Sequence, residues 1–321
     1  MIIELITPAL AGARNGNGIT ALRWARLLKQ MGHKVFMEKA YGGGSCDLMI
    51  ALHARRSFQS IRRFKEAHPR RPLIVVLTGT DLYRDIRIDS DARESLELAT
   101  RLIVLQSMGV EELPRRLRAK TRVIYQSAAQ VDGRGSPAAG ALFKVCVISH
   151  LRPEKDPLRT AMAARQLPAS SRVQVLHIGR PLTGEMNKRL RAEAARNPRF
   201  HWLGELPHWK TRQVLAGSHL LSVTSRMEGS SNALSEAIAS SVPVVASRIP
   251  GLIGTLGKNY PGYFPAGKTR ALARLLRRAE SDPRFYRSLK AHCARLRPLV
   301  DPKSERAAWQ QLLAELSRSP F

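Results

Sequence analysis

Two glutamates, Glu228 and Glu236, lie eight residues apart in the segment SRMEGSSNALSEAIASSVPVVAS. The residue pattern between them predicts a helix that begins at Ser230 or Ser231, which leaves Glu228 in the preceding loop and Glu236 about one and a half turns inside the helix. The backbone N–H groups at such a helix start, with the side chains of Ser230, Ser231 and Asn232, make a site for an anion. A carboxylate beside that anion can accept two hydroxyls of a ribose. The alternative is that both glutamates are capping and surface acids.

A second candidate site lies in HLRPEKDP, the loop after the predicted strand FKVCVIS. It places two cations, Arg152 and Lys155, at the carboxyl end of a strand and before a helix. Two cations opposite a helix start can clamp a diphosphate, although an exposed loop with ordinary charges is the alternative. Ligands of open α/β sheets bind at the carboxyl ends of the strands. Two such loops in one domain therefore favour a binding site.

Short β-branched runs alternate with helical patterns along the whole chain. Five strands are predicted in the first half, IIELI, DLMIAL, PLIVVLT, RLIVLQS and TRVIYQS, and five in the second, FKVCVIS, RVQVLHIG, FHWLG, HLLSVTS and PVVAS. Strands joined by crossover helices form parallel sheets with both faces covered. The stretch AAQVDGRGSPAAGAL, near residues 128–142, has the composition of a linker. The chain is therefore predicted to form an α/β fold with two Rossmann-like domains facing a cleft.

The predicted domain boundaries follow from this linker. The N-terminal domain spans residues 1–135 and the C-terminal domain residues 136–300. Residues 301–321 contain the amphipathic pattern KSERAAWQQLLAELSRS, a helix expected to cross the hinge and pack back on the first domain. Within the first domain, a helix is expected to begin near Thr20, a good N-cap residue, and to end at Gly32, a good residue for a helix end.

The bulk composition limits the class of protein. In a chain of 321 residues, 44% hydrophobic, no apolar run approaches the ~20 residues that span a bilayer. Cys46, Cys146 and Cys293 are expected to be free, buried thiols, and no secretory signal follows Met1, so a cytoplasmic location is expected. The net charge of +28 suits a nucleic-acid partner. Arginines spread along helices, without an aromatic-rich strand, instead favour a solvated surface, so no specific nucleic acid is expected.

The segment EGSSNALSEAIASSVPVVAS resembles the E-x7-E motif of the large group of nucleotide-sugar glycosyltransferases with the GT-B fold, and HLRPEKDP is similar to their diphosphate-binding loop. This resemblance implies that Glu236 holds the ribose and that Glu228 contacts the donor sugar. It implies that Arg152 and Lys155 take the diphosphate. Ser241 departs from the pattern, because the family usually has glycine before the Pro-Val pair, and the effect is expected to be local.

The same resemblance implies further donor-binding residues, all in the C-terminal domain. The uracil is placed against the backbone near FHWLGEL. The further donor residues that it implies lie in this loop and at the start of the E-x7-E helix: Gly204, Leu206, Gly229, Ser230, Ser231 and Asn232.

A closer resemblance covers the N-terminal half. The segments TPALAGARNGNGITALRWARLL, ALHARRS and LTGTDLYRDI, with IPGLIGTLGKNYPGYFPAG further on, look like the selenosugar synthases of selenoneine biosynthesis, the SenB family. These enzymes join selenophosphate to a UDP-sugar, typically UDP-N-acetylglucosamine, and form a carbon–selenium bond. The resemblance implies the same two substrates here, no cofactor, and an N-terminal domain that binds the acceptor.

The resemblance to GT-B glycosyltransferases implies that the loop NGNG lies near the donor phosphate and sugar. Gly16 and Gly18 would let the backbone approach the ligand closely, while Asn15 and Asn17 offer amide hydrogen bonds. The alternative is a loop that only turns a corner.

A pocket for selenophosphate, a small and multiply charged anion, should be rich in arginine. The candidate acceptor residues follow two predicted strands: His53, Arg55 and Arg56 after DLMIAL, and Thr78, Thr80, Asp81 and Arg84 after PLIVVLT. Arg55 or Arg56 is expected to bind the anion first, with Arg84 next. His53 is a candidate for acceptor contact or proton handling, and a structural histidine is the alternative.

The tripeptide Asp89-Ser90-Asp91 has the D-x-D form of a metal-binding signature from a different glycosyltransferase fold. It follows no suitable strand and is interpreted as an acidic helix start, so no essential metal is expected. Two other functions stay open. One is a glycosyltransferase acting on a hydroxyl of a lipid or polysaccharide, which would need a base. The other is a non-catalytic nucleic-acid-binding protein on the same scaffold, which has no need of the four charged donor residues.

Overall fold

The computed structural model describes residues 1–8, 16–131 and 142–318, which divide into two compact units. The first unit comprises Met1–Gln126, Gly229–Ser231 and Lys303–Phe321, and the second comprises Ser127–Glu228 and Asn232–Pro302. Each is built on a six-stranded sheet whose strands all pair in parallel. The prediction of two Rossmann-like α/β domains is confirmed. The predicted boundary at residues 135 and 136 lies outside the described residues.

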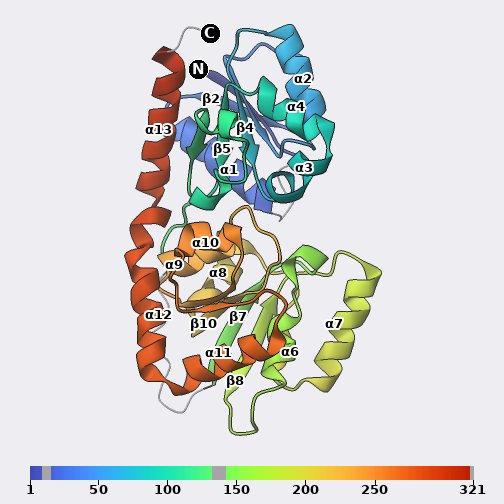
Figure 1. Cartoon of the computed structure of the whole chain (residues 1–321), viewed down its shortest axis with the longest axis vertical. Helices are drawn as coiled ribbons and strands as arrows, with labels where there is room; N and C mark the ends of the chain where they lie inside the picture. The colour runs from blue at the N-terminus through green and yellow to red at the C-terminus, as the bar shows by residue number, and fades with distance from the viewer. Residues whose placement is uncertain (9–15, 132–141, 319–321) are drawn as a thin grey trace. The chain divides into compact units, whose positions relative to one another are not determined.

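The sheet of the first unit has the strand order β2-β1-β3-β4-β5-β6, and Figure 1 labels three of its strands, β2, β4 and β5. Its strands are β1 (Ile2–Ile6), β2 (Lys34–Glu38), β3 (Leu48–Leu52), β4 (Leu73–Leu77), β5 (Arg101–Val104) and β6 (Thr121–Val123). Every residue of β3 and β4 is buried, because helices cover both faces of a parallel sheet. The edge strand β2 was not predicted. It buries only Val35, so it lacks the continuous apolar run that identifies a central strand.

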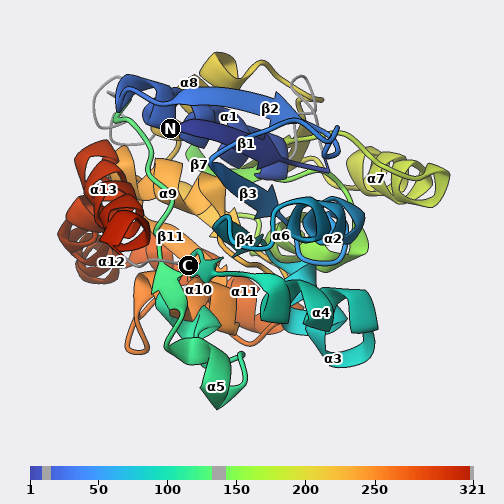
Figure 2. The ribbon, with the colours of Figure 1, turned by 90° about the horizontal axis from the view of Figure 1, so that it is seen from above.

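Two sets of helices cover the two faces of this sheet. Its helical elements are α1 (Gly16–Gln30), α2 (Phe58–Ala67), the π-helical turn η1 (Asp81–Asp85), α3 (Ile86–Ile88), α4 (Ser90–Leu98), the 3-10 turn η2 (Ser107–Gly109), α5 (Arg115–Arg118) and α13 (Pro302–Arg318). Helices α1 and α13 share one apolar cluster with the sheet, whereas α2, α4 and α5 share another. Figure 2 shows α2 and α4 on one side of the sheet and α13 on the other. The C-terminal helix packs on the first domain, as predicted. Trp309 of α13 contacts Trp24 of α1, with ring centroids 4.9 Å apart.

The sheet of the second unit has the order β12-β11-β10-β7-β8-β9. Its strands are β7 (Phe143–Ile148), β8 (Val173–Ile178), β9 (Phe200–Trp202), β10 (Leu220–Val223), β11 (Val244–Ser247) and β12 (Tyr263–Phe264). The two-residue edge strand β12 was not predicted. The strand order changes direction between β7 and β10, so the loops after these two strands lie next to each other at the carboxyl edge, where ligands of open sheets bind.

A single apolar cluster joins this sheet to its helices. The helical elements are the 3-10 turn η3 (Pro153–Lys155), α6 (Arg159–Ala164), α7 (Gly184–Arg196), α8 (His208–Ala216), α9 (Asn232–Ala239), α10 (Pro250–Leu256), α11 (Thr269–Ser281), α12 (Pro283–Arg295) and the 3-10 turn η4 (Arg297–Val300). Helix α6 packs against α11 and β8, while α8 and α9 pack against each other and against β7 and β10.

The three cysteines are buried free thiols, as predicted. Burial raises the pKa of Cys46 and Cys293 to about 11 and that of Cys146 to about 12. A thiol reacts as its thiolate. At neutral pH these side chains therefore act as small apolar groups in the two cores.

Candidate active site

Two loops of the second unit bring together a predicted cation and a predicted carboxylate. Lys155 Nζ donates a hydrogen bond to Glu228 Oε1 at 2.5 Å, and the hydroxyl of Ser225 donates to the same oxygen at 2.7 Å. Glu228 is 6% exposed. A buried carboxylate stays ionised only with such partners. The pair therefore fixes one cation and one anion at the carboxyl edge of the sheet.

The loop after β7 holds the backbone of Lys155. Thr224 Oγ1 donates to the carbonyl oxygens of Lys155 and Asp156, at 3.1 and 2.9 Å. Asp156 takes a left-handed φ of 44°, which ends the turn Pro153–Lys155. Arg152 precedes this turn in an extended conformation and is exposed. Lys155 is thus held in place, whereas Arg152 projects from the loop toward solvent.

Gly251 allows helix α10 to approach the loop that carries Glu228. A Cβ atom added at Gly251 would lie 1.8 Å from the carbonyl oxygen of Glu228. Since this distance is far inside van der Waals contact, the position requires glycine. The hydroxyl of Ser247 donates to the carbonyl of Ser225 at 2.5 Å and joins β11 to the same loop.

Glu236 lies in the second turn of α9 and is 8% exposed. Its Oε1 accepts a hydrogen bond from His208 Nε2 at 2.7 Å. His208 was not among the predicted site residues. Its position directly after the loop predicted to hold the uracil, at the carboxyl end of β9, was the available signal. The pair gives the second glutamate a fixed orientation, as Lys155 does for the first.

The helix that carries Glu236 starts one residue after Ser231, at Asn232, close to its predicted start. Of the residues that lead into it, Gly229 and Ser231 are buried, and Ser230 and Asn232 are half-buried. The backbone N–H groups of such a helix start, with the positive end of the helix dipole, favour an anion.

Ser241 completes the far end of α9. Its N–H donates to the carbonyl of Ile238, the N–H of Val242 donates to that of Ala237, and Ser241 has a φ of 57°. This is a Schellman motif with a serine at the left-handed position that glycine usually occupies. The departure of Ser241 from the glycosyltransferase pattern therefore falls on a residue with positive φ.

The loops after β7, β8 and β9 pack closely where the uracil was predicted to bind. Gly179 donates its N–H to the carbonyl of Gly204 at 2.8 Å, and a Cβ at Gly179 would meet the carbonyl oxygen of Ser149 at 2.0 Å. Gly204 has a φ of 71°, and Leu206 is half-buried against the core. Both lie at the same carboxyl edge as Glu228.

In the first unit, His53 follows β3 with a left-handed φ of 73° and is 2% exposed. The N–H of Arg56 donates to its Nδ1 at 3.3 Å, so Nε2 carries the proton and donates to Thr80 Oγ1 at 3.0 Å. Burial lowers the pKa of His53, partly opposed by the nearby carboxylate of Asp81. The imidazole is therefore neutral at neutral pH and holds two turns together.

Asp81 is fully buried, in contrast to its predicted place among the acceptor contacts. Its carboxylate accepts the N–H groups of Thr78 at 2.9 Å, Gly79 at 2.8 Å and Ala54 at 3.1 Å. These bonds join the turn after β4 to the turn after β3. Asp81 therefore positions the two turns rather than facing a ligand, and the half-buried Thr78 and Thr80 lie on one of them.

Two of the predicted arginines converge on one carboxylate. Arg55 Nε lies 3.2 Å from Asp85 Oδ2, and Arg84 Nε donates to Asp85 Oδ1 at 2.9 Å. The side chains of Arg55 and Arg84 are 43% and 44% exposed, while Asp85 is buried. Arg56 is exposed on the same turn as Arg55. Arg55 Nη1 also lies 3.9 Å from Asp89 Oδ2, so these two acids balance Arg55 and Arg84, and the exposed Arg56 adds a positive charge that suits a small anion.

The predicted opening loop is partly a helix. Gly16, Asn17 and Gly18 form the first turn of α1, whereas Asn15 lies outside the described residues. The prediction that this helix begins near Thr20 is wrong, because α1 already includes Gly16. Thr20 lies in the second turn, where its hydroxyl donates to the carbonyl of Gly16 at 2.9 Å, a bond that satisfies the hydroxyl inside the helix.

Asp89 accepts the N–H of Ala92 at 2.8 Å and caps α4, which confirms that the D-x-D tripeptide is a helix start. Across the described parts of the chain, no cluster of three or more His, Cys, Asp or Glu side chains has the geometry to hold a metal ion.

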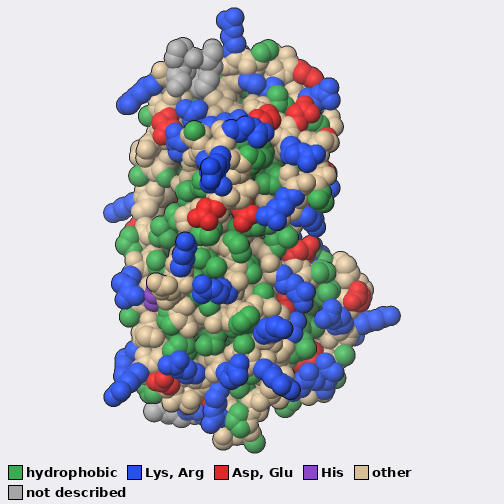
Figure 3. Space-filling view, viewed as in Figure 1, with side chains coloured by type: hydrophobic (Ala, Val, Ile, Leu, Met, Phe, Trp, Pro, Cys, Tyr) green, Lys and Arg blue, Asp and Glu red, His purple; other side chains and the backbone are tan. Residues whose placement is uncertain are grey.

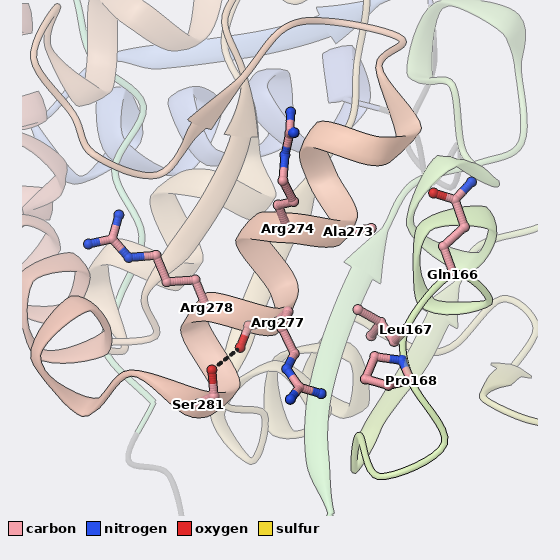
Figure 4. Close-up of a pocket in the computed structure, with 8 residues that line it drawn as sticks. All are labelled: Gln166, Leu167, Pro168, Ala273, Arg274, Arg277, Arg278 and Ser281. Atoms are coloured by element: carbon pink, nitrogen blue, oxygen red, sulfur yellow. Dashed lines mark hydrogen bonds between the residues drawn. The ribbon is translucent and has the colours of Figure 1, made fainter.

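A cavity of about 390 Å³ lies between α11 and the turn after α6 (Figure 4). Helix α6 begins near the carboxyl end of β7 and runs back, so this cavity is at the amino edge of the sheet. Figure 4 shows Arg274, Arg277 and Arg278 pointing away from one another. Because the guanidinium groups diverge, the cavity is not arranged as an anion site.

Two units, each with a six-stranded parallel sheet covered by helices, give the described part of the chain a fold of the GT-B type. The chain belongs to the family of group 1 glycosyl transferases, whose model matches residues 134–295. No helix in the described residues is both long and apolar enough to span a membrane.

Solved structures share the fold over nearly the whole chain. HepE from Anabaena, in complex with UDP and glucose, is 20% identical with a TM-score of 0.76, and the match covers 99% of this chain and 100% of that one. Sucrose-phosphate synthase from Thermosynechococcus elongatus is 18% identical with a TM-score of 0.78, over 98% and 99% of the two chains. A glycosyltransferase from Rickettsia africae is 12% identical with a TM-score of 0.75, over 99% of each chain. The GT-B prediction is confirmed.

Proposed function

We propose that this glycosyltransferase is a selenosugar synthase that transfers the sugar of a UDP-sugar, UDP-N-acetylglucosamine, to selenophosphate. The observation that carries the donor part is the set of paired charges, Lys155 with Glu228 and His208 with Glu236, at one carboxyl edge of the group 1 glycosyltransferase domain. HepE, which shares the fold, was solved with UDP and glucose. That ligand supports UDP as the leaving group here.

In the proposed reaction, the selenium of selenophosphate attacks the anomeric carbon of the donor. A carbon–selenium bond forms while the bond from that carbon to the diphosphate oxygen breaks, and its electron pair leaves with UDP. Arg152, Lys155 and the start of α9 stabilise the negative charge on the diphosphate, and the proposal assigns this role to no metal. Water then attacks phosphorus and cleaves the phosphorus–selenium bond, which releases inorganic phosphate and the selenosugar.

Arg55 and Arg84 support a small anionic acceptor. Both are partly exposed, both lie beside Asp85, and the exposed Arg56 adds a third guanidinium on the same turn. Guanidinium groups bind phosphate oxygens in a bidentate way. A phosphate-bearing nucleophile is therefore a better match to this surface than a neutral hydroxyl.

His53 supports the same choice of nucleophile. Its two ring nitrogens are occupied by Thr80 and by the N–H of Arg56, and it is 2% exposed. A hydroxyl acceptor needs a base within hydrogen-bond reach. Selenophosphate is already an anion with a soft selenium atom, so it needs no such base, and His53 can serve as a positioning residue for the arginine turn.

The experiment is mass spectrometry of purified protein incubated with UDP-N-acetylglucosamine, with and without selenophosphate. A sugar product with the selenium isotope pattern, formed together with UDP and only when both substrates are present, is the expected result. If UDP binds but no selenosugar forms, the acceptor assignment is wrong and hydroxyl acceptors on lipids or polysaccharides become the alternative. If no uridine nucleotide binds, the donor assignment is wrong as well.

Variants of the arginine turn test the acceptor site separately. Arg55→Ala and Arg84→Ala should each raise the KM for selenophosphate about tenfold or more, because each removes a charged hydrogen bond, and should leave the affinity for UDP unchanged. Arg62→Ala is the matched control, since Arg62 lies on the adjacent helix α2 and pairs with Glu66. An equal loss of UDP affinity in the Arg55 and Arg84 variants would contradict the assignment.

A further inference from the structure

His208 links the loop expected to face the uracil to Glu236, the residue expected to hold the ribose. It is the first residue of α8, directly after Gly204–Pro207, the segment expected to face the uracil. Its side chain is 56% exposed, while that of its partner Glu236 is 10% exposed. The imidazole thus covers the mostly buried carboxylate from the solvent side.

The hydrogen bond from His208 leaves acceptor capacity on the carboxylate. It involves Oε1 only, at 2.7 Å, and an ionised carboxylate offers about four lone-pair positions on its two oxygens. A side chain with several rotatable bonds loses entropy when a ligand fixes it. An imidazole that fixes the carboxylate beforehand removes part of that cost for a ligand with two adjacent hydroxyls.

The backbone before His208 is itself tied to the sheet. Gly204 accepts the N–H of Gly179 at 2.8 Å, and Glu205 pairs with Arg180 at 3.3 Å. The N–H of Thr211 donates to the carbonyl of Pro207 at 2.9 Å and closes the first turn of α8. A few bonds therefore join the loop expected to face the uracil to the imidazole, and the imidazole to Glu236.

We propose that His208 is a positioning residue that presents Glu236 to the ribose diol of the donor and couples it to the uracil loop. The inference rests on the proposed function, because it assumes a uridine nucleotide in this site. It assigns no contact between His208 and the nucleotide. Its effect must then depend on both ribose hydroxyls and on Glu236.

The test is isothermal titration calorimetry with UDP and with 2′,3′-dideoxy-UDP, which lacks both ribose hydroxyls. His208→Ala should weaken UDP binding about tenfold and change dideoxy-UDP binding by no more than about twofold. His208→Gln should recover most of the affinity, because its amide can donate from nearly the same place as Nε2. His201→Ala is the matched control: His201 is exposed in the same unit but pairs with Gln174.

A double-mutant cycle with Glu236→Gln completes the test. Positioning predicts that His208→Ala adds little further loss to the Glu236→Gln variant, since the carboxylate that it orients is already gone. Equal losses for UDP and dideoxy-UDP in His208→Ala, or additive losses in the double variant, would overturn the inference and leave the proposed function standing. If the unchanged protein binds neither nucleotide, the proposed function itself is wrong.

Discussion

At the scale of single residues, several side chains in each unit adopt conformations or lie in surroundings that cost free energy. Ser241 ends the helix of Glu236 with a φ of 57°, His53 has a φ of 73°, and His177 is fully buried. Each L residue in a left-handed conformation costs about 1–2 kcal/mol. Such positions persist where the surrounding structure fixes them.

Replacing Ser241 with glycine should stabilise the second unit. Glycine has no Cβ penalty at a positive φ, so Ser241→Gly is expected to raise the free energy of unfolding by about 1 kcal/mol. Urea denaturation measures it. Ser240→Gly is the matched control, because Ser240 precedes the left-handed position and does not have a positive φ. A change of the same sign in both variants would contradict the role given to Ser241.

His177 should make folding sensitive to acid. Burial lowers its pKa from 6.5 to about 4, and its Nε2 donates to the carbonyl of Ser149 at 3.0 Å. Above pH 6.5 the imidazole is neutral in both states. As the pH falls from 6.5 to 4, the unfolded chain binds a proton that the folded unit does not, so stability is lost through this window, by about 2 kcal/mol at pH 5.

The variant His177→Gln isolates this effect, because glutamine keeps an N–H donor and does not titrate. The free energy of unfolding of the second unit is measured at pH 7.5 and at pH 5. Its decrease between the two pH values should be about 2 kcal/mol smaller in the variant than in the unchanged protein. Parallel pH profiles for the two proteins would show that His177 is protonated in the folded state.

At the scale of secondary-structure elements, close approach of two backbones decides the geometry near Glu228. Gly251→Ala places a Cβ 1.8 Å from the carbonyl oxygen of Glu228 in the present geometry, so α10 or the loop must move. Steady-state kinetics should show a donor-dependent kcat/KM lowered by about tenfold or more, because small misplacements at a site are costly.

Gly184→Ala is the control for this change. Gly184 also lies in the first turn of a helix, α7, but an added Cβ there meets no atom within 4 Å. Activity should be retained in this variant. If Gly251→Ala keeps full activity and stability, the packing of α10 does not control the position of Glu228.

The sequence predicted the central strands of both sheets correctly. The buried runs of β3 and β4, for example, carry a continuous apolar signal. Strand β2 and the pair of residues in β12 carry too little of that signal, because an edge strand buries few side chains. The predicted start of α1 was wrong because the Thr20 hydroxyl bonds to a carbonyl inside the helix. Whether a threonine caps a helix or lies inside it depends on tertiary packing, which cap preference does not describe.

The sequence alone did not predict which side chains, distant along the chain, form pairs. The four charged residues predicted for the donor site could be placed near strand ends, but only the folded backbone brings Lys155 to Glu228 or His208 to Glu236. The burial of Asp81 was also missed, because a Thr-Gly-Thr-Asp turn reads the same whether its carboxylate faces a ligand or the backbone N–H groups.

At the scale of the whole molecule, the basic charge is spread over the surface. On the face shown in Figure 3, Lys and Arg side chains are scattered over both units with acidic side chains among them. Several arginines form ion pairs with nearby acids, as Arg122 does with Glu315 at 2.8 Å. This distribution agrees with a solvated surface better than with a single nucleic-acid-binding patch.

The first unit depends on a helix that is remote in sequence. Glu305 of α13 is 2% exposed and accepts hydrogen bonds from Trp24 Nε1 at 2.7 Å and from Arg23 Nε at 3.0 Å. Removing one member of a buried ion pair leaves the other uncompensated. Glu305→Ala should therefore destabilise the first unit by about 3 kcal/mol.

Differential scanning calorimetry should show this loss as a lower transition temperature for the first unit alone. Glu185→Ala is the control, because Glu185 is 76% exposed and pairs weakly with Arg189, so its removal should have little effect. A uniform shift of the whole calorimetric trace in Glu305→Ala would mean that the two units do not unfold separately.

The placement of α13 in the first unit also bears on how the protein is made. Residues 127–302 intervene between the sheet of the first unit and the helix that covers Trp24. At a translation rate of about 5–20 residues per second, the ribosome takes roughly 10–35 s to make that intervening stretch. During this time the first unit exposes the apolar face that α13 later covers. The second unit can already fold around its own core. The unit whose sheet is made first is thus completed last, and until then its exposed apolar face favours aggregation.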